Sequence, residues 1–164
     1  MVESPPSSNK IISQNTSDED LVALMASAKR HNDKDLWWKC LRRRFELKRQ
    51  EVSEKNSPME QEFYAVMLAY EAIEAELHHR NKYRAVRTWK EFENKGVRAT
   101  LEKWAKNKPK GPVFNTLVDH DAYDLTGEYL VFKHETEFST EAVASARQSL
   151  LKAGVPIEKL QASL

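Results

Sequence analysis

Apolar side chains recur three and four positions apart along most of this chain, the spacing that places them on one face of a helix. Two such runs lie on either side of the polar turn His31-Asn32-Asp33. Ser17 is a favourable N-cap for the first run, because its hydroxyl can accept a hydrogen bond from a free backbone N–H of the first turn. The pattern predicts an antiparallel helical hairpin over residues 17–51.

A second helix start is indicated at Ser57, which can cap a helix whose first residue is Pro58. Glu60 stands where a capping box has its carboxylate. The helix that follows is predicted to run to about His79. Its apolar face consists of Phe63, Val66, Met67, Tyr70, Ile73 and Leu77.

Shorter helices are predicted after residue 80. They cover 82–94, 97–106, a brief stretch after the break at 109–112, and a last helix that starts after Ser139. Tyr83 and Val86 are expected to face inward in the first of them. Gly96 suits the left-handed residue that commonly ends a helix, and it separates the first helix from the second.

Residues 122–134 fit two structures. Leu125, Tyr129 and Phe132 would share one face of a helix, whereas Tyr129, Val131 and Lys133 alternate as in a strand. Periodicity alone does not separate short apolar runs. We favour a helix and keep a small β-hairpin near 125–134 as the alternative.

The expected fold class is all-α, with six or seven helices. Residues 1–16 are polar and contain two prolines, which predicts a disordered tail. Residues 17–164 are then one helical domain, in which the 17–51 hairpin packs on a 58–152 body.

Three stretches taken together resemble a family of uncharacterised bacterial proteins, commonest in proteobacteria. They are Glu62-Phe63-Tyr64 through Glu71, Arg87-Thr88-Trp89 through Trp104, and Leu125-Thr126-Gly127-Glu128-Tyr129 through Val143. The resemblance covers about residues 60–152. It implies a bacterial origin and one continuous unit, and it carries over no activity and no functional residue.

Composition narrows the choice of chemistry. A single cysteine, Cys40, excludes an intrachain disulfide and a cysteine-rich zinc site. The first residues have neither a basic head nor an apolar stretch, and no run approaches the ~18 apolar residues of a membrane span. We therefore expect a cytoplasmic protein without a membrane partner.

The net charge of +1 hides a strong segregation of charge along the chain. Residues 29–50 carry a balance of +6 and residues 80–110 a balance of +8, while the segments before, between and after them are acidic. Blocks of this size shape the field of a protein more than its total charge does. Tyr83, Trp89 and Trp104 are interleaved with the arginines of the second block, a combination that can hold phosphates and stack on bases.

These basic segments favour a non-enzymatic nucleic-acid-binding protein, with DNA as the expected ligand. The residues predicted to bind are Arg42, Arg43, Arg80, Arg84, Arg87 and Arg98. Arg80, Arg84 and Arg87 are spaced by four and three, so a helix through them would present all three on one face. The alternative is a protein–protein interaction or assembly module, whose partner is another protein or a second copy of this chain, and a nuclease is a distant third.

Other residue patterns that could indicate a binding or metal site are weaker. The turn Glu93–Val97 resembles that of a helix-turn-helix, but Lys95 and Glu102 occupy positions where apolar residues are needed. A recognition helix and wing over 112–134 would carry acidic residues near the phosphates. Glu76–His79 is half of a di-iron motif without a second copy. The sequence therefore predicts no metal and no cofactor.

Overall fold

The computed structural model describes residues 12–13, 16–51 and 56–161, and within these ranges the chain is all-helical. The eight α-helices there are α2 (Asp18–Arg30), α3 (Lys34–Glu51), α4 (Pro58–Leu77), α5 (Val86–Lys106), α6 (Pro112–Asp119), α7 (Gly127–Lys133), α8 (Thr140–Lys152) and α9 (Ile157–Gln161). Two 3-10 turns, η1 (Tyr123–Leu125) and η2 (Glu135–Glu137), flank α7. The all-α prediction is confirmed, and the helices outnumber the six or seven expected.

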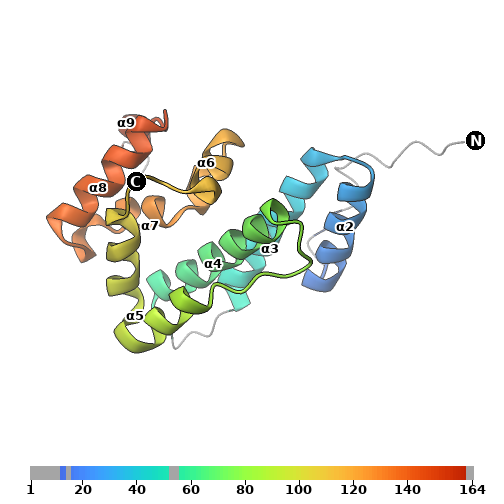
Figure 1. The fold of residues 1–164 in the computed structure, drawn as a ribbon, viewed down its shortest axis with the longest axis horizontal. Helices are drawn as coiled ribbons and strands as arrows, with labels where there is room; N and C mark the ends of the chain where they lie inside the picture. The colour runs from blue at the N-terminus through green and yellow to red at the C-terminus, as the bar shows by residue number, and fades with distance from the viewer. Residues whose placement is uncertain (1–11, 14–15, 52–55, 162–164) are drawn as a thin grey trace, which may run out of the picture.

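Figure 1 shows two groups of helices, α2 with α3 toward one end of the molecule and α5 to α9 toward the other, with α4 between them. Helix α4 joins the two groups, because it packs against α3 as well as against α5, α6 and α7. Its side chains are accordingly buried on more than one face, among them Phe63, Met67 and Ile73. Most of the predicted disordered tail, residues 1–16, lies outside the described residues; Ile12 packs partly against the core.

The N-terminal hairpin forms as predicted. The Ser17 hydroxyl accepts a hydrogen bond from the backbone N–H of Asp20 at 3.1 Å, and α2 ends in the turn at Asn32, whose φ is 54°. Leu21, Cys40 and Leu41 are fully buried where α2 and α3 face each other. An ion pair between Arg44 Nε and Asp18 Oδ1, at 2.7 Å, also ties the two helices together.

Helix α4 begins where the sequence indicates. The Ser57 hydroxyl accepts from the backbone N–H of Glu60 at 3.2 Å, and Pro58 occupies the first turn. The Glu60 carboxylate accepts from the side-chain amide of Asn56 at 2.7 Å. The helix ends at Leu77, two residues before the predicted His79.

The predicted helix over 82–94 begins four residues too early. Helix α5 starts at Val86, and residues 78–85 form an irregular segment between α4 and α5. Val86 is therefore not a core residue but is 51% exposed. The physical reason lies in α4, whose Glu71 carboxylate accepts from the backbone N–H of Ala85 at 2.9 Å. This hydrogen bond holds residue 85 at the helix start.

Gly96 interrupts α5 as predicted. Its φ of 85° and ψ of 174° lie in a region that is essentially restricted to glycine. A Cβ at this position would meet no atom within 4 Å, so the cost of a side chain there is conformational and not steric.

Replacing Gly96 with Ala is expected to lower the free energy of unfolding by about 1–2 kcal/mol, because alanine is strained at these dihedral angles. Gly111 is the matched control, since its φ of −82° is open to any residue and its surroundings are equally open. Urea unfolding followed by circular dichroism measures both variants. Equal stability of the two variants would contradict the expectation.

The possible β-hairpin near 125–134 is wrong. Residues 127–133 form helix α7, and no strand occurs in the part of the chain that the structure describes. The Thr126 hydroxyl caps this helix by accepting from the backbone N–H of Tyr129 at 3.1 Å. Leu130, Val131 and Phe132 are all buried, which a two-faced hairpin on the surface would not allow. The wing proposed for 112–134 therefore has no counterpart.

The C-terminal part closes the fold around a second, smaller core. Phe114 of α6, Phe132 of α7 and Leu150 of α8 meet there, together with Val155 and Ile157. Helix α8 begins after Ser139, as predicted, and the Ser139 hydroxyl accepts from the backbone N–H of Ala142. Helix α9 extends the helical body beyond the predicted limit at residue 152.

Candidate nucleic-acid interface

The segment that joins α4 to α5 is strongly basic. From His78 to Lys90 the chain contains no Asp or Glu and five Lys or Arg residues, namely Arg80, Lys82, Arg84, Arg87 and Lys90. All five are exposed. None of them lies within ion-pair distance of a carboxylate of the described residues.

Local contacts hold this segment in an irregular path. His79 has a φ of 52°, which turns the chain away from α4. The backbone N–H of Arg80 then donates to the carbonyl of Ala75 at 2.8 Å. At the other end, Glu71 accepts from Ala85 N–H. The segment is thus tied down at both ends while its cationic side chains stay in solvent.

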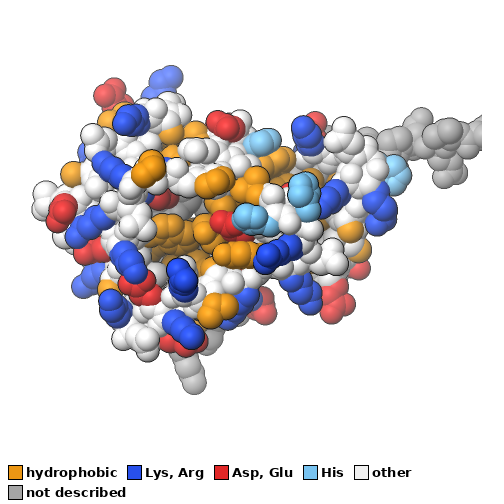
Figure 2. All heavy atoms as spheres, in the orientation of Figure 1, with side chains coloured by type: hydrophobic (Ala, Val, Ile, Leu, Met, Phe, Trp, Pro, Cys, Tyr) orange, Lys and Arg blue, Asp and Glu red, His pale blue; other side chains and the backbone are white. Residues whose placement is uncertain are grey.

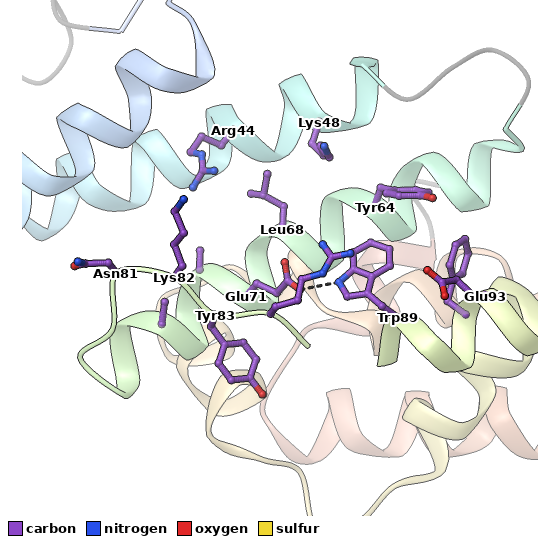
Figure 3. Close-up of a pocket in the computed structure, with 14 residues that line it drawn as sticks. Arg44, Lys48, Tyr64, Leu68, Glu71, Asn81, Lys82, Tyr83, Trp89 and Glu93 are labelled. Carbon is purple, nitrogen blue, oxygen red and sulfur yellow. Dashed lines mark hydrogen bonds between the residues drawn. The ribbon is translucent and has the colours of Figure 1, made fainter. Parts of the chain in front are cut away.

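A groove lies between this segment, α3 and α4, with a volume of about 720 Å³. Figure 3 shows Arg44 and Lys48 entering it from α3, and Lys82 extending from the opposite side toward Arg44. The first turns of α5 close its end with Trp89 and Glu93.

Aromatic side chains line one end of the groove. Tyr64, Trp89 and Phe92 pack against one another, with ring centroids 5.4 Å apart for Tyr64 and Trp89 and 5.6 Å for Tyr64 and Phe92. Each of the three is only partly buried. The guanidinium carbon of Arg84 lies over the Trp89 ring, 4.6 Å from its centroid, a cation–π contact.

Glu71 positions Trp89 at this end of the groove. Its Oε1 accepts from the indole Nε1–H of Trp89 at 2.7 Å and from the backbone N–H of Ala85 at 2.9 Å. The dashed line in Figure 3 marks the indole hydrogen bond. One carboxylate of α4 therefore fixes both the indole and the start of α5.

The charge of the groove is positive. Its lining includes four cations, Arg44, Lys48, Lys82 and Arg84, and two carboxylates, Glu71 and Glu93. On the α3 side, Asp18 pairs with Arg44 and Glu51 lies 3.6 Å from Lys48. The cations on the opposite side have no such partner among the described residues, so the positive potential is concentrated on the 78–90 segment.

The structure brings together only some of the predicted site residues. Arg84 lines the groove, and Arg80 and Arg87 stand on the adjoining segment and the first turn of α5. The prediction that Arg80, Arg84 and Arg87 share one face of a helix is wrong, because Arg80 and Arg84 precede α5.

The remaining predicted residues lie outside the groove. Arg42 donates to both carboxylate oxygens of Asp124, at 2.9 and 3.1 Å, and to the carbonyl of Asp121. The hydrogen bond with Asp124 raises the pKa of Arg42, as expected of a cation held in place by a carboxylate. Arg43 is half-buried, and Arg98 is exposed beyond the break at Gly96.

Other cations of the two basic blocks are neutralised by neighbours. The hydrogen bond from Lys103 lowers the pKa of Glu91, which also pairs with Lys95. Arg49 pairs with Glu46 at 2.8 Å. Figure 2 shows Lys and Arg side chains interspersed with Asp and Glu over this face, without one uninterrupted positive surface.

Several residues of the groove were not singled out from the sequence. Arg44 lines the groove because α3 lies beside the 78–90 segment, and Glu71 appeared in the sequence only within a stretch that carries the family resemblance. The absence of acidic residues from 78 to 90 was the signal that could have found Lys82 and Lys90.

Two other kinds of feature are missing from the described residues. No three His, Cys, Asp or Glu side chains gather there as a metal ion would require. No helix there is both long and apolar enough to span a bilayer.

No protein-family model, curated protein or solved structure matches this chain. The resemblance over residues 60–152 therefore stays a prediction.

Proposed function

We propose that this protein binds nucleic acid through the 78–90 segment and the groove beside it. The observation that carries the proposal is the run of five exposed cations, Arg80 to Lys90, without an acidic residue among them or an ion pair to the described carboxylates. Cations already held by carboxylates release little free energy on meeting phosphate, whereas solvated ones release the counterions of the nucleic acid.

The side-chain types support phosphate as the group recognised. Arg80, Arg84 and Arg87 present planar guanidinium forks that can donate two hydrogen bonds to one phosphate. The backbone of the segment is anchored at Arg80 and Ala85, so less conformational entropy is lost on docking than with a free tail. The aromatic rings of the groove add surface on which bases can stack.

Replacing Arg80, Arg84 and Arg87 together with Ala is expected to weaken binding to DNA by about 1–3 kcal/mol and to flatten the dependence of log affinity on log salt. The loss follows from the phosphate contacts removed. Gel-shift titrations at two salt concentrations measure both the affinity and the slope.

The matched control removes the same net charge from cations that are already paired. Lys29, Arg49 and Lys103 form exposed ion pairs with Glu76, Glu46 and Glu91. Their replacement by Ala is expected to change affinity and slope much less. Equal losses in both triple variants would show that only net charge matters, and no binding by the native protein at low salt would overturn the proposal.

An assembly module is the second candidate, and the alternation of charge in Figure 2 favours it. Surfaces with interspersed charges of both signs can be complementary to a second copy or to another charged protein. Sedimentation velocity at low and high salt tests the second-copy form of this candidate. A monomer under both conditions would exclude self-assembly.

A further inference from the structure

Three contacts fix Trp89 at the edge of the groove. Its indole N–H is fixed by Glu71 at 2.7 Å, and its ring contacts Tyr64 on one side of the groove. Arg84 covers the ring, with its guanidinium carbon 4.6 Å from the centroid. The indole, the guanidinium and the cations of α3 all border the same volume.

We infer that this groove is a subsite for an unpaired base, and that the protein therefore prefers single-stranded over double-stranded nucleic acid. The inference rests on the proposed function and specifies its ligand. A base enters between the two cationic sides and stacks against the Arg84–Trp89 pair, while Lys82 contacts a neighbouring phosphate.

The shape of the groove supports a single strand. Its volume of about 720 Å³ falls in the range of roughly 300–1,000 Å³ that small-molecule sites occupy. Its aromatic rings Tyr64 and Trp89 lie at one end, between the cations of α3 on one side and Lys82 on the other. A duplex keeps its bases stacked inside and would reach only those cations, whereas a base that has left the stack can reach the aromatic rings.

Arg84 differs from its neighbours in this respect. Arg80 and Arg87 have no aromatic ring under them in the described part of the chain, so they contribute charge and hydrogen bonds alone. A guanidinium also offers a flat surface for stacking on a base, which an ammonium group lacks. Changing Arg84 to Lys therefore keeps the charge and removes the stacking surface.

The test compares three labelled oligonucleotides of equal length: a DNA single strand, an abasic strand with the same phosphates, and a duplex. Fluorescence anisotropy titrations are run with the native chain, Arg84→Lys and Arg80→Lys. The native protein is expected to bind the single strand about tenfold more tightly than the abasic strand or the duplex, because one stacked base contributes on this order.

Arg84→Lys is expected to lose most of that preference and to bind the abasic strand as the native protein does. Arg80→Lys, the matched control, is expected to keep the preference. Thermal unfolding of both variants checks that the fold is intact. Each variant retains the net charge, so a change in preference reports on stacking and not on electrostatic attraction.

The outcomes separate this inference from the function on which it rests. Failure of the native chain to bind any of the three ligands at low salt overturns the proposed function. Equal binding of the base-bearing and abasic strands, or equal effects of Arg84→Lys and Arg80→Lys, overturns the base subsite and leaves nucleic-acid binding in place. A preference for the duplex also overturns it.

Discussion

Replacing Lys110 with Met is expected to lower the free energy of unfolding by about 4 kcal/mol, the largest single effect that the structure predicts. Lys110 Nζ lies 3.0 Å from Glu128 Oε1, and the side chains of the pair are only 12% and 5% exposed. The same ammonium donates to the carbonyls of Trp104 and Ala105, at 3.0 and 3.1 Å. Its loss leaves a buried carboxylate and the C-terminal end of α5 without their cation.

Urea unfolding measures this effect against two comparisons. Lys133→Met removes a more exposed cation, whose 2.7 Å contact with Glu62 is partly screened by water, and is expected to cost much less. The double variant Lys110→Met, Glu128→Leu is expected to recover most of the stability, because no buried charge remains unpaired. A loss for Lys110→Met no larger than that for Lys133→Met would contradict the role assigned to the buried pair.

Replacing Glu71 with Leu is expected to lower the free energy of unfolding by about 3 kcal/mol and to weaken nucleic-acid binding several-fold. Two hydrogen bonds to a charged acceptor disappear, which leaves the Trp89 indole and the start of α5 unheld. The direction of the binding change is informative. Removing a carboxylate makes the groove more positive, so electrostatics alone would predict tighter binding.

Glu93 is the matched control, since it lines the same groove, is exposed and forms no hydrogen bond or ion pair through its side chain with the described residues. Glu93→Gln removes the same charge without disturbing Trp89, and binding is expected to tighten slightly. Stability is read from thermal unfolding and affinity from anisotropy titrations, both at temperatures where each variant is folded. Tighter binding by Glu71→Leu would show that the positioning of Trp89 does not matter.

Much of the local structure could be predicted from the sequence. Ser17, Ser57 and Gly96 act where their chemistry indicated, because capping and left-handed conformations depend on the residue itself and its immediate neighbours. The apolar spacing likewise predicted the N-terminal hairpin and the long α4. Arg84 was also among the predicted binding residues, and the groove includes it.

Contacts between distant residues decided the rest. The start of α5 depends on Glu71, fourteen positions before Ala85, so the 82–94 pattern alone placed Arg84 on a helix to which it does not belong. Residues 127–133 form a helix that is largely buried against its neighbours. The periodicity of so short a run does not distinguish such a helix from a strand.

The charge of a side chain and its availability for binding are decided at different levels of structure. The sequence by itself determined that two segments of this chain are basic, since charge is a property of each residue. Only the tertiary structure decided which of those cations are available: Asp124 holds Arg42, whereas the five Lys and Arg side chains of the 78–90 segment form no ion pair with a described carboxylate. An ion pair depends on the distance between two charges in space, and its partners can be far apart in the sequence. Arg42 and Asp124, for example, are 82 positions apart along the chain.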